Sequence, residues 1–214
     1  MAETGYLTAG QMAGAFQMLR SYDLMWSRMV NEYLLGERST MNDLMAWNAD
    51  ATRMPARMHS QYLRQLFLND ALSEGRYLVE GRPIVLSDID LPIFCVATLT
   101  DHVAPWRSVY KLHYLTPTEI RFVLTSGGHN AGIVSEPGRP RRSFRMRTRP
   151  AGDNYVPPDD WVLQVPETEG SWWPAWTAWL AARDGKRVAP PALGAAAAGY
   201  PALEDAPGRY VHEK

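Results

Sequence analysis

Two strand-like segments separated by a helical pattern constrain the fold of this chain more than any other feature. Residues 93–97 (IFCVA) form a short continuous apolar run, as in a strand buried on both faces of a parallel sheet, and residues 120–124 (IRFVL) form a second strand candidate. Apolar residues with helical spacing lie between them, at 105–115. This succession of strand, helix and strand predicts an α/β fold.

A polar residue suited to proton transfer follows each predicted strand. Asp101 comes after the first strand and His129 after the second, 28 residues later. Functional groups of open α/β sheets gather at the carboxyl ends of the strands, so we expect these two side chains to lie together. The carboxylate would hold the imidazole in one tautomer and stabilise the imidazolium. Acid followed by histidine is also the chain order of α/β-hydrolases.

Other segments of the chain have simpler patterns. Residues 11–35 carry larger apolar residues at helical intervals and predict a long amphipathic helix that stops at Gly36. The remaining predictions are a helix around 58–67, a hairpin within 76–86, a Trp-rich helix over 171–183 with Ser171 as its N-cap, and an Ala/Pro-rich linker beyond 185.

Composition excludes several classes of function. With 22 basic and 23 acidic residues the net charge is -1, which gives no overall attraction to nucleic acid. No apolar stretch approaches the roughly 20 residues of a membrane span, and the start lacks a signal-peptide pattern, so we expect a soluble protein. A single cysteine, Cys95, favours a reducing cytoplasm, and the absence of zinc-type Cys/His spacing predicts no metal.

Five separate motifs, taken in order, closely resemble those of class I poly(3-hydroxyalkanoate) synthases. They are 47–59 (WNADATRMPARMH), 101–106 (DHVAPW), 124–134 (LTSGGHNAGIV), 169–179 (EGSWWPAWTAW) and 207–211 (PGRYV). The resemblance runs along the whole chain but corresponds only to the later, catalytic portion of the family. It implies a partial α/β-hydrolase fold, comprising the C-terminal strands and helices of the sheet, preceded by a helical lid.

The family's chemistry gives Asp101 and His129 specific roles. By the resemblance, Asp101 is the acid of a catalytic triad and His129 is the general base. The base activates a cysteine that attacks the thioester of (R)-3-hydroxyacyl-CoA, and the growing polyester is carried covalently. Acyl-CoA is then a substrate, and no resident cofactor is implied. His102 matches a histidine of the family, and Trp47 lies where the chain would return to the hydrolase core, so both are candidate accessory residues.

The resemblance also implies a division of the chain and a set of partners. Residues 1–46 would be the lid segment, 47–184 the C-terminal part of the hydrolase core, and 185–214 an Ala/Pro-rich tail. The family implies a cytoplasmic homodimer, associated with polyhydroxyalkanoate granules and without a membrane span.

One departure from the family's pattern concerns the nucleophile. The family places its cysteine in a Gly-x-Cys-x-Gly turn, and neither this pattern nor Gly-x-Ser-x-Gly occurs in the 214 residues. Cys95 lies inside an apolar run and is interpreted as a buried strand residue, since an activated thiolate needs an exposed, electropositive setting. We therefore expect the isolated chain to be inactive.

Three hypotheses account for this departure. In the first, the chain is a polymerase segment whose nucleophile lies upstream, either in a truncated product or because the start was assigned too late. In the second, it is a non-catalytic remnant that binds granules or a full-length synthase. In the third, it is a fragment of another α/β-hydrolase, such as a thioesterase or lipase.

Three further groups of residues allow two readings each. The arginines of 139–149 could meet the phosphates of CoA, although a solvated strand and loop is the simpler interpretation. The tryptophans of 172–179 have helical spacing typical of packing, while a contact with polymer is the alternative. His59 and His113 are expected on a surface or in packing rather than on a metal.

Overall fold

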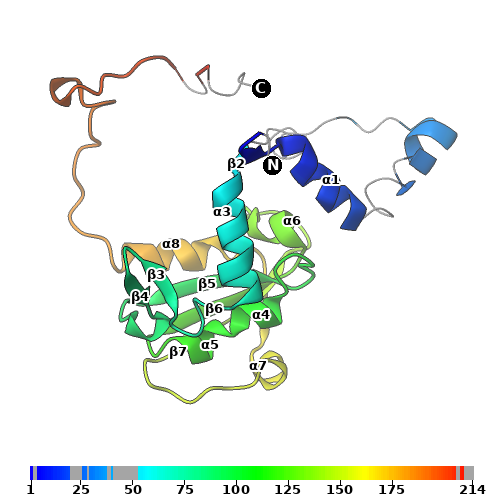
Figure 1. Cartoon of the computed structure of the whole chain (residues 1–214). Helices are drawn as coiled ribbons and strands as arrows, with labels where there is room; N and C mark the ends of the chain where they lie inside the picture. Colours follow the sequence, from blue (N-terminus) through cyan, green and yellow to red (C-terminus); the bar gives the residue numbers. More distant parts are fainter. Residues whose placement is uncertain are drawn as a thin grey trace. The chain divides into compact units, whose positions relative to one another are not determined.

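The chain forms two compact units in the computed structural model. The structure describes residues 1, 4–19, 26–27, 29–37, 40, 53–205 and 208–209. The N-terminal unit comprises Met1–Asn69 together with Ala189–Lys214, and the sheet unit comprises Asp70–Val188. Both are drawn in Figure 1.

Local hydrogen bonds define the helices of the N-terminal unit. Helix α1 (Ala9–Leu19) begins with a capping box, in which Thr8 Oγ1 accepts from the N–H of Gln11 and Gln11 Oε1 accepts from the N–H of Thr8. A π-helical segment, Met29–Leu34, ends before Gly36, whose φ is 70°. Both ends of the predicted 11–35 helix are therefore helical, while residues 20–25 and 28 lie outside the described residues.

The other described residues of this unit form a short sheet, a helix and an irregular tail. Strand β1 (Tyr6–Leu7) pairs antiparallel with β2 (Met54–Pro55). Helix α3 (Ala56–Gln61) continues into a π-helical turn, Tyr62–Leu68, which confirms the helix expected around 58–67. The tail contains one 3₁₀ turn, Ala196–Ala198. No helix in the described part of the chain combines the length and the apolar character needed to cross a bilayer.

A four-stranded mixed sheet organises the sheet unit. Its strands are β5 (Ile93–Thr98), β6 (Ile120–Thr125), β7 (Ser143–Arg149) and β8 (Glu167–Glu169), in the order β5-β6-β7-β8. Strands β5 and β6 are parallel, whereas the other two pairs are antiparallel. The predicted α/β class and the two predicted strands are confirmed.

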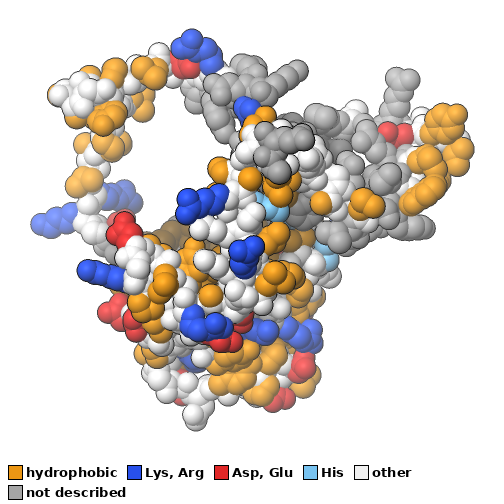
Figure 2. Space-filling model, in the orientation of Figure 1, with side chains coloured by type: hydrophobic (Ala, Val, Ile, Leu, Met, Phe, Trp, Pro, Cys, Tyr) orange, Lys and Arg blue, Asp and Glu red, His pale blue; other side chains and the backbone are white. Residues whose placement is uncertain are grey.

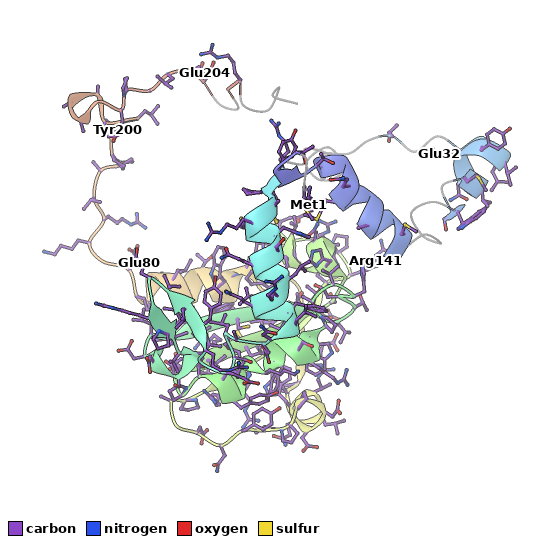
Figure 3. The ribbon with its side chains drawn as sticks, viewed as in Figure 1. Met1, Glu32, Glu80, Arg141, Tyr200 and Glu204 are labelled. Carbon is purple, nitrogen blue, oxygen red and sulfur yellow. The ribbon has the colours of Figure 1, made fainter. Side chains whose placement is uncertain are left out.

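A small hairpin precedes this sheet at the position predicted for it. Strands β3 (Tyr77–Val79) and β4 (Arg82–Ile84) pair antiparallel across Glu80 and Gly81. Glu80, labelled in Figure 3, has φ 51° and Gly81 has φ 76°. Two successive positive φ angles match the two-residue turns whose twist suits a hairpin.

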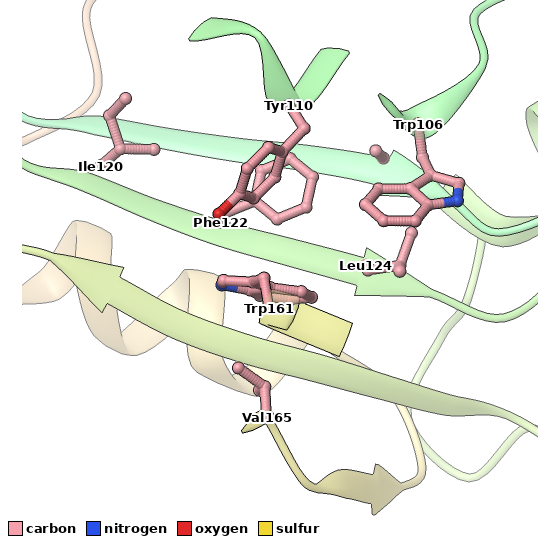
Figure 4. Close-up of a cluster of buried hydrophobic side chains, with 8 residues drawn as sticks. Trp106, Tyr110, Ile120, Phe122, Leu124, Trp161 and Val165 are labelled. Atoms are coloured by element: carbon pink, nitrogen blue, oxygen red, sulfur yellow. The ribbon is translucent and has the colours of Figure 1, made fainter. Parts of the chain in front are cut away.

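Short helices cover both faces of the four-stranded sheet. They are α4 (Trp106–Tyr110), α5 (Leu112–Leu115), α6 (His129–Ile133), α7 (Pro158–Gln164) and α8 (Trp173–Ala181). On one face, Trp106 and Tyr110 of α4 and Trp161 of α7 form a core with alternate residues of β6, among them Phe122 (Figure 4).

On the other face, Trp172 and Trp173 pack with Val123, Phe144 and Phe94. The alternation of side chains along β5 and β6 thus feeds two separate cores. Figure 2 shows basic and acidic side chains interspersed among apolar ones over the sheet unit, as expected for a nearly neutral chain.

Some boundaries differ from the predictions. The 105–115 helix is two helices that meet at Lys111, and the Trp-rich helix is shorter than 171–183, with Trp172 rather than Ser171 at its N-cap. Ser171 Oγ nevertheless accepts from the N–H of Trp173 at 3.1 Å. Helices α6 and α7 and strand β8 were not predicted.

Candidate active site

The loop after β5 is folded around the carboxylate of Asp101. Its Oδ1 accepts hydrogen bonds from the backbone N–H groups of Val103 at 2.8 Å and Ala104 at 2.9 Å. Such bonds from a side chain to the backbone two and three residues on are characteristic of Asp in turns. Thr98, the last residue of β5, donates its hydroxyl to Oδ2 at 3.4 Å. The carboxylate is therefore fixed before it meets any other side chain.

His129 meets this carboxylate from the end of the neighbouring strand. Its Nδ1 lies 2.9 Å from Asp101 Oδ2. The two loops are tied together by backbone bonds, from Leu99 N–H to the Thr125 carbonyl at 2.9 Å and from Thr100 N–H to the Gly127 carbonyl at 3.1 Å. Parallel pairing of β5 and β6 thus brings the two strand ends, and the two side chains, to one place.

Gly127 permits the sharp turn between β6 and His129. Its φ is +104°, in a region that side chains with a Cβ rarely adopt. A Cβ at this position would also lie 2.8 Å from Nη1 of Arg142 and 3.1 Å from the backbone of Gly132. The turn therefore needs glycine for both conformation and space.

The electrostatics of the pair keep the carboxylate charged. Burial raises the pKa of Asp101, but hydrogen bonds from Ala104 N–H, His129 and Val103 N–H outweigh it, so the net pKa is lowered. The Asp101 side chain is 8% exposed, whereas that of His129 is 47% exposed. With Nδ1 directed at a carboxylate, Nε2 is the ring nitrogen available to accept a proton.

The two accessory candidates are not placed in this arrangement. His102 is exposed and makes no hydrogen bond to another described residue. Trp47 lies outside the described residues. Their accessory roles stay predictions.

Cys95 lies away from the strand ends, in the middle of β5. It is in register with Phe122, is partly buried and packs against the core. Desolvation raises the pKa of its thiol to about 11, which disfavours the thiolate. These observations support its interpretation as a packed strand residue.

His113 and the arginine run have structural partners. His113 is 3% exposed and stacks on Tyr110 with ring centroids 4.0 Å apart, and burial lowers its pKa to about 4, as the packing interpretation predicts. Arg145 donates to the carbonyl of Val165, and Arg149 donates to three backbone carbonyls. Among the described residues, no group of three or more His, Cys, Asp or Glu side chains could hold a metal ion.

Residues outside the predicted set also shape the site. Thr98 and the backbone of Val103 and Ala104 bind Asp101, and the order Asp-x-Val-Ala-Pro is the signal that could have indicated this turn. The side chains of 171–173 donate hydrogen bonds to the segment that follows His129, although the sequence predicts Ser171 as an N-cap and the two tryptophans as packing residues. These long-range contacts have no sequence signal.

A carboxylate and an imidazole at neighbouring strand ends define an acid–base pair in an α/β protein. No family model matches the chain. It is, however, 41% identical over 214 residues to a poly(3-hydroxyalkanoate) polymerase subunit of Rhizobium etli, covering 100% of this chain and 33% of that protein. It is also 42% identical over 215 residues to a poly(3-hydroxyalkanoate) polymerase of Methylorubrum extorquens, covering 34% of it.

The Cupriavidus necator polymerase subunit is 39% identical over 208 residues, which cover 95% of this chain and 34% of that protein. The chain therefore spans about a third of the length of the relatives it matches. It is homologous to a C-terminal portion of the poly(3-hydroxyalkanoate) polymerases.

Proposed function

We propose that this chain is the acid–base part of a poly(3-hydroxyalkanoate) polymerase, an acyltransferase that joins (R)-3-hydroxyacyl units from CoA thioesters into polyester and releases CoA. Asp101 would be the triad acid and His129 the general base, in the C-terminal part of an α/β-hydrolase fold. The observation that carries the proposal is the 2.9 Å contact between His129 Nδ1 and Asp101 Oδ2, in a chain homologous to these polymerases.

In the proposed reaction His129 moves one proton at a time. Nε2 removes the proton of a cysteine thiol, and the thiolate attacks the thioester carbonyl of the hydroxyacyl-CoA. CoA leaves as its thiolate and takes the proton back from Nε2, so that the acyl group is held on the enzyme's cysteine. Nε2 then accepts the proton of a 3-hydroxyl group that attacks an acyl thioester; the ester bond forms as the C–S bond breaks, and the thiolate that leaves takes the proton back from Nε2. Asp101 stabilises the imidazolium at each stage.

The nucleophile in this scheme is not Cys95. A thiol whose pKa is raised to about 11 by burial, in mid-strand, is poorly suited to attack. The reacting cysteine would come from another part of the polymerase, and the isolated chain would not turn over. His102 and Trp47 would assist the site, residues 1–46 would act as the lid, and the complete enzyme would work as a cytoplasmic dimer on polyester granules.

Release of free CoA from 3-hydroxybutyryl-CoA tests this proposal. The isolated chain should release none beyond background. A chimera in which it replaces the matching third of the Cupriavidus necator polymerase should be active, and His129→Ala should lower its rate by roughly 10²–10⁴-fold. Asp101→Asn should also slow the chimera, because the carboxylate that stabilises the imidazolium is lost, and Asp184→Asn, at an exposed carboxylate, is its matched control. The assignment would be refuted if the isolated chain released CoA and His129→Ala abolished that release. It would also be refuted if the chimera stayed active with His129→Ala.

A further inference from the structure

Three consecutive side chains donate hydrogen bonds to the backbone just downstream of His129. Trp172 donates its indole N–H to the carbonyl of Gly132 at 3.3 Å, and Trp173 donates to the carbonyl of Ile133 at 2.9 Å. Ser171 Oγ donates to the carbonyl of Ser135. We name residues 171–173 the SWW clamp.

The acceptors of these bonds belong to the end of helix α6 and the residues after it. Helix α6 has five residues, and the last carbonyls of any helix lack partners within the helix. So short a helix is not stable by itself, because the conformational entropy lost in forming its first turn outweighs the free energy gained from its few hydrogen bonds. The SWW clamp supplies the missing donors from 40 residues away.

The position of α6 decides where His129 lies, because His129 is its first residue. Near its other end, Gly132 is so close to β5 that a Cβ on it would lie 2.5 Å from Cγ2 of Thr98. The hydroxyl of the same Thr98 donates to Asp101. Helix α6 therefore rests on the residue that also holds the carboxylate, and its withdrawal would separate His129 from Asp101.

The clamp itself is anchored to the sheet. Trp172 is 6% exposed and packs with Val123 and Phe144. The turn before it is fixed by Gly170 N–H, which donates to the carbonyl of Arg142 at 2.7 Å. The hydroxyl of Ser171 also accepts from the N–H of Trp173, the first residue of α8, at 3.1 Å. This bond orients the Ser171 hydroxyl that donates to Ser135.

We infer that Ser171, Trp172 and Trp173 are positioning residues, which hold helix α6 against Thr98 and thereby keep His129 Nδ1 on Asp101. The catalytic meaning of this inference rests on the proposed function, but the geometry can be tested without turnover. The competing view, that these tryptophans only fill space, predicts a loss of stability without a change at His129.

Nitrogen-15 NMR of the His129 side chain in the 214-residue chain separates the two views. The parent chain should show mostly the tautomer with the proton on Nδ1. Trp173→Phe keeps the ring but removes the donor, and Ser171→Ala removes one hydroxyl. Both should lose that tautomer preference at temperatures well below unfolding, and Ser171→Thr should restore it. The matched control is Trp176→Phe, on the same helix α8, because the Trp176 side chain is 40% exposed and its indole N–H donates to no described residue.

Each outcome decides the inference. An unchanged Nδ1 tautomer in both Trp173→Phe and Ser171→Ala, with folding intact, would overturn it, as would an equal loss in Trp176→Phe. In the active chimera the same two variants should lower kcat several-fold with little change in KM. If His129→Ala left the chimera active, the proposed function would fail, while the tautomer measurement would still decide the positioning role.

Discussion

The two edges of the four-stranded sheet differ in length, charge and burial. Strand β8 has three exposed residues, two of them glutamates, which is a common way to keep an edge from pairing with another chain. Strand β5 has six residues without any charge, and its two faces contribute to two different cores. In the described part of the chain, β5 nevertheless has a strand on one side only.

This difference indicates that β8 is suited to the edge of a sheet, whereas β5 has the features of an interior strand. Parallel strands are usually buried on both sides of their sheet. The N–H groups of Ile93 and Leu99 point to β6, so by alternation those of Phe94 and Val96 point to the open side. Since the chain also covers only about a third of its relatives, we expect β5 to pair with another strand in a complete polymerase, or with a second copy in the isolated chain.

Proline substitutions at adjacent positions of β5 should give the largest effect. Ala97→Pro removes an N–H that points to β6, which should cost about 3 kcal/mol or more and unfold the sheet unit. Val96→Pro removes an N–H on the open side, so it should cost about 1 kcal/mol and convert associated chain to monomer. Thermal unfolding and light scattering measure the two effects. Equal destabilisation, or a wild-type chain that is already monomeric, would break the comparison.

A methyl group at Gly132 should come next in size. At this glycine helix α6 packs closely against Thr98 at the end of β5. A Cβ on Gly170, beside β8, would instead meet nothing within 4 Å. Gly132→Ala should destabilise the chain by about 1–3 kcal/mol because Thr98 must move. Gly14→Ala, in α1 with open space around it, is the control and should be neutral or stabilising. Urea titration gives both values, and equal midpoints would contradict the close contact.

Low pH should reduce the stability of the folded chain by protonating Asp101, which follows β5. Because its pKa is lowered in the folded chain, its stabilising effect is complete above the pKa of the unfolded chain and is lost as the pH falls through the folded value. At pH 7 Asp101→Asn should cost about 1–3 kcal/mol through the hydrogen bonds to its charge. The difference from wild type should shrink towards pH 3. A constant difference across this range would show that the charge plays no part.

Removing a charge from β8 should give the smallest change in stability. Glu169→Val should alter the free energy of unfolding by less than about 0.5 kcal/mol, since the residue is exposed. It should, however, increase concentration-dependent association by exposing an uncharged edge. Light scattering against Asp184→Val, a substitution outside any strand, tests this. If the two variants associate equally, the edge charge is not protective.

The parts of the fold that the sequence predicts are those with local signals. Strands β5 and β6 are compact apolar segments followed by polar loops, and the β3–β4 hairpin carries a turn signal at Glu80 and Gly81. The strand expected within the arginine segment 139–149 is β7, but the partners of its arginines, such as the carbonyl of Val165, lie far along the chain and have no local signal. Helix α6 has no local signal because its stabilising donors come from 171–173.

The candidate site divides in the same way. The order of Asp101 and His129 and their location after neighbouring strands follow from the sequence, and the 2.9 Å contact matches the geometry expected for them. The support from Thr98 and from the SWW clamp depends on tertiary packing, which no spacing reveals. The catalytic roles of Asp101 and His129 remain predictions, which the chimera tests.

The antiparallel direction of β7 determines which arginines lie near the Asp101–His129 end of the sheet. Ser143 at its start pairs with Ser126, just beyond the end of β6, and Arg149 at its end pairs with Ile120. Each step along the arginine run therefore leads away from the Asp101–His129 end of the sheet. An anionic group at His129 would be nearer to Arg142, whose Nη1 lies beside the Gly127 turn, than to Arg149, which donates to three backbone carbonyls at the opposite end.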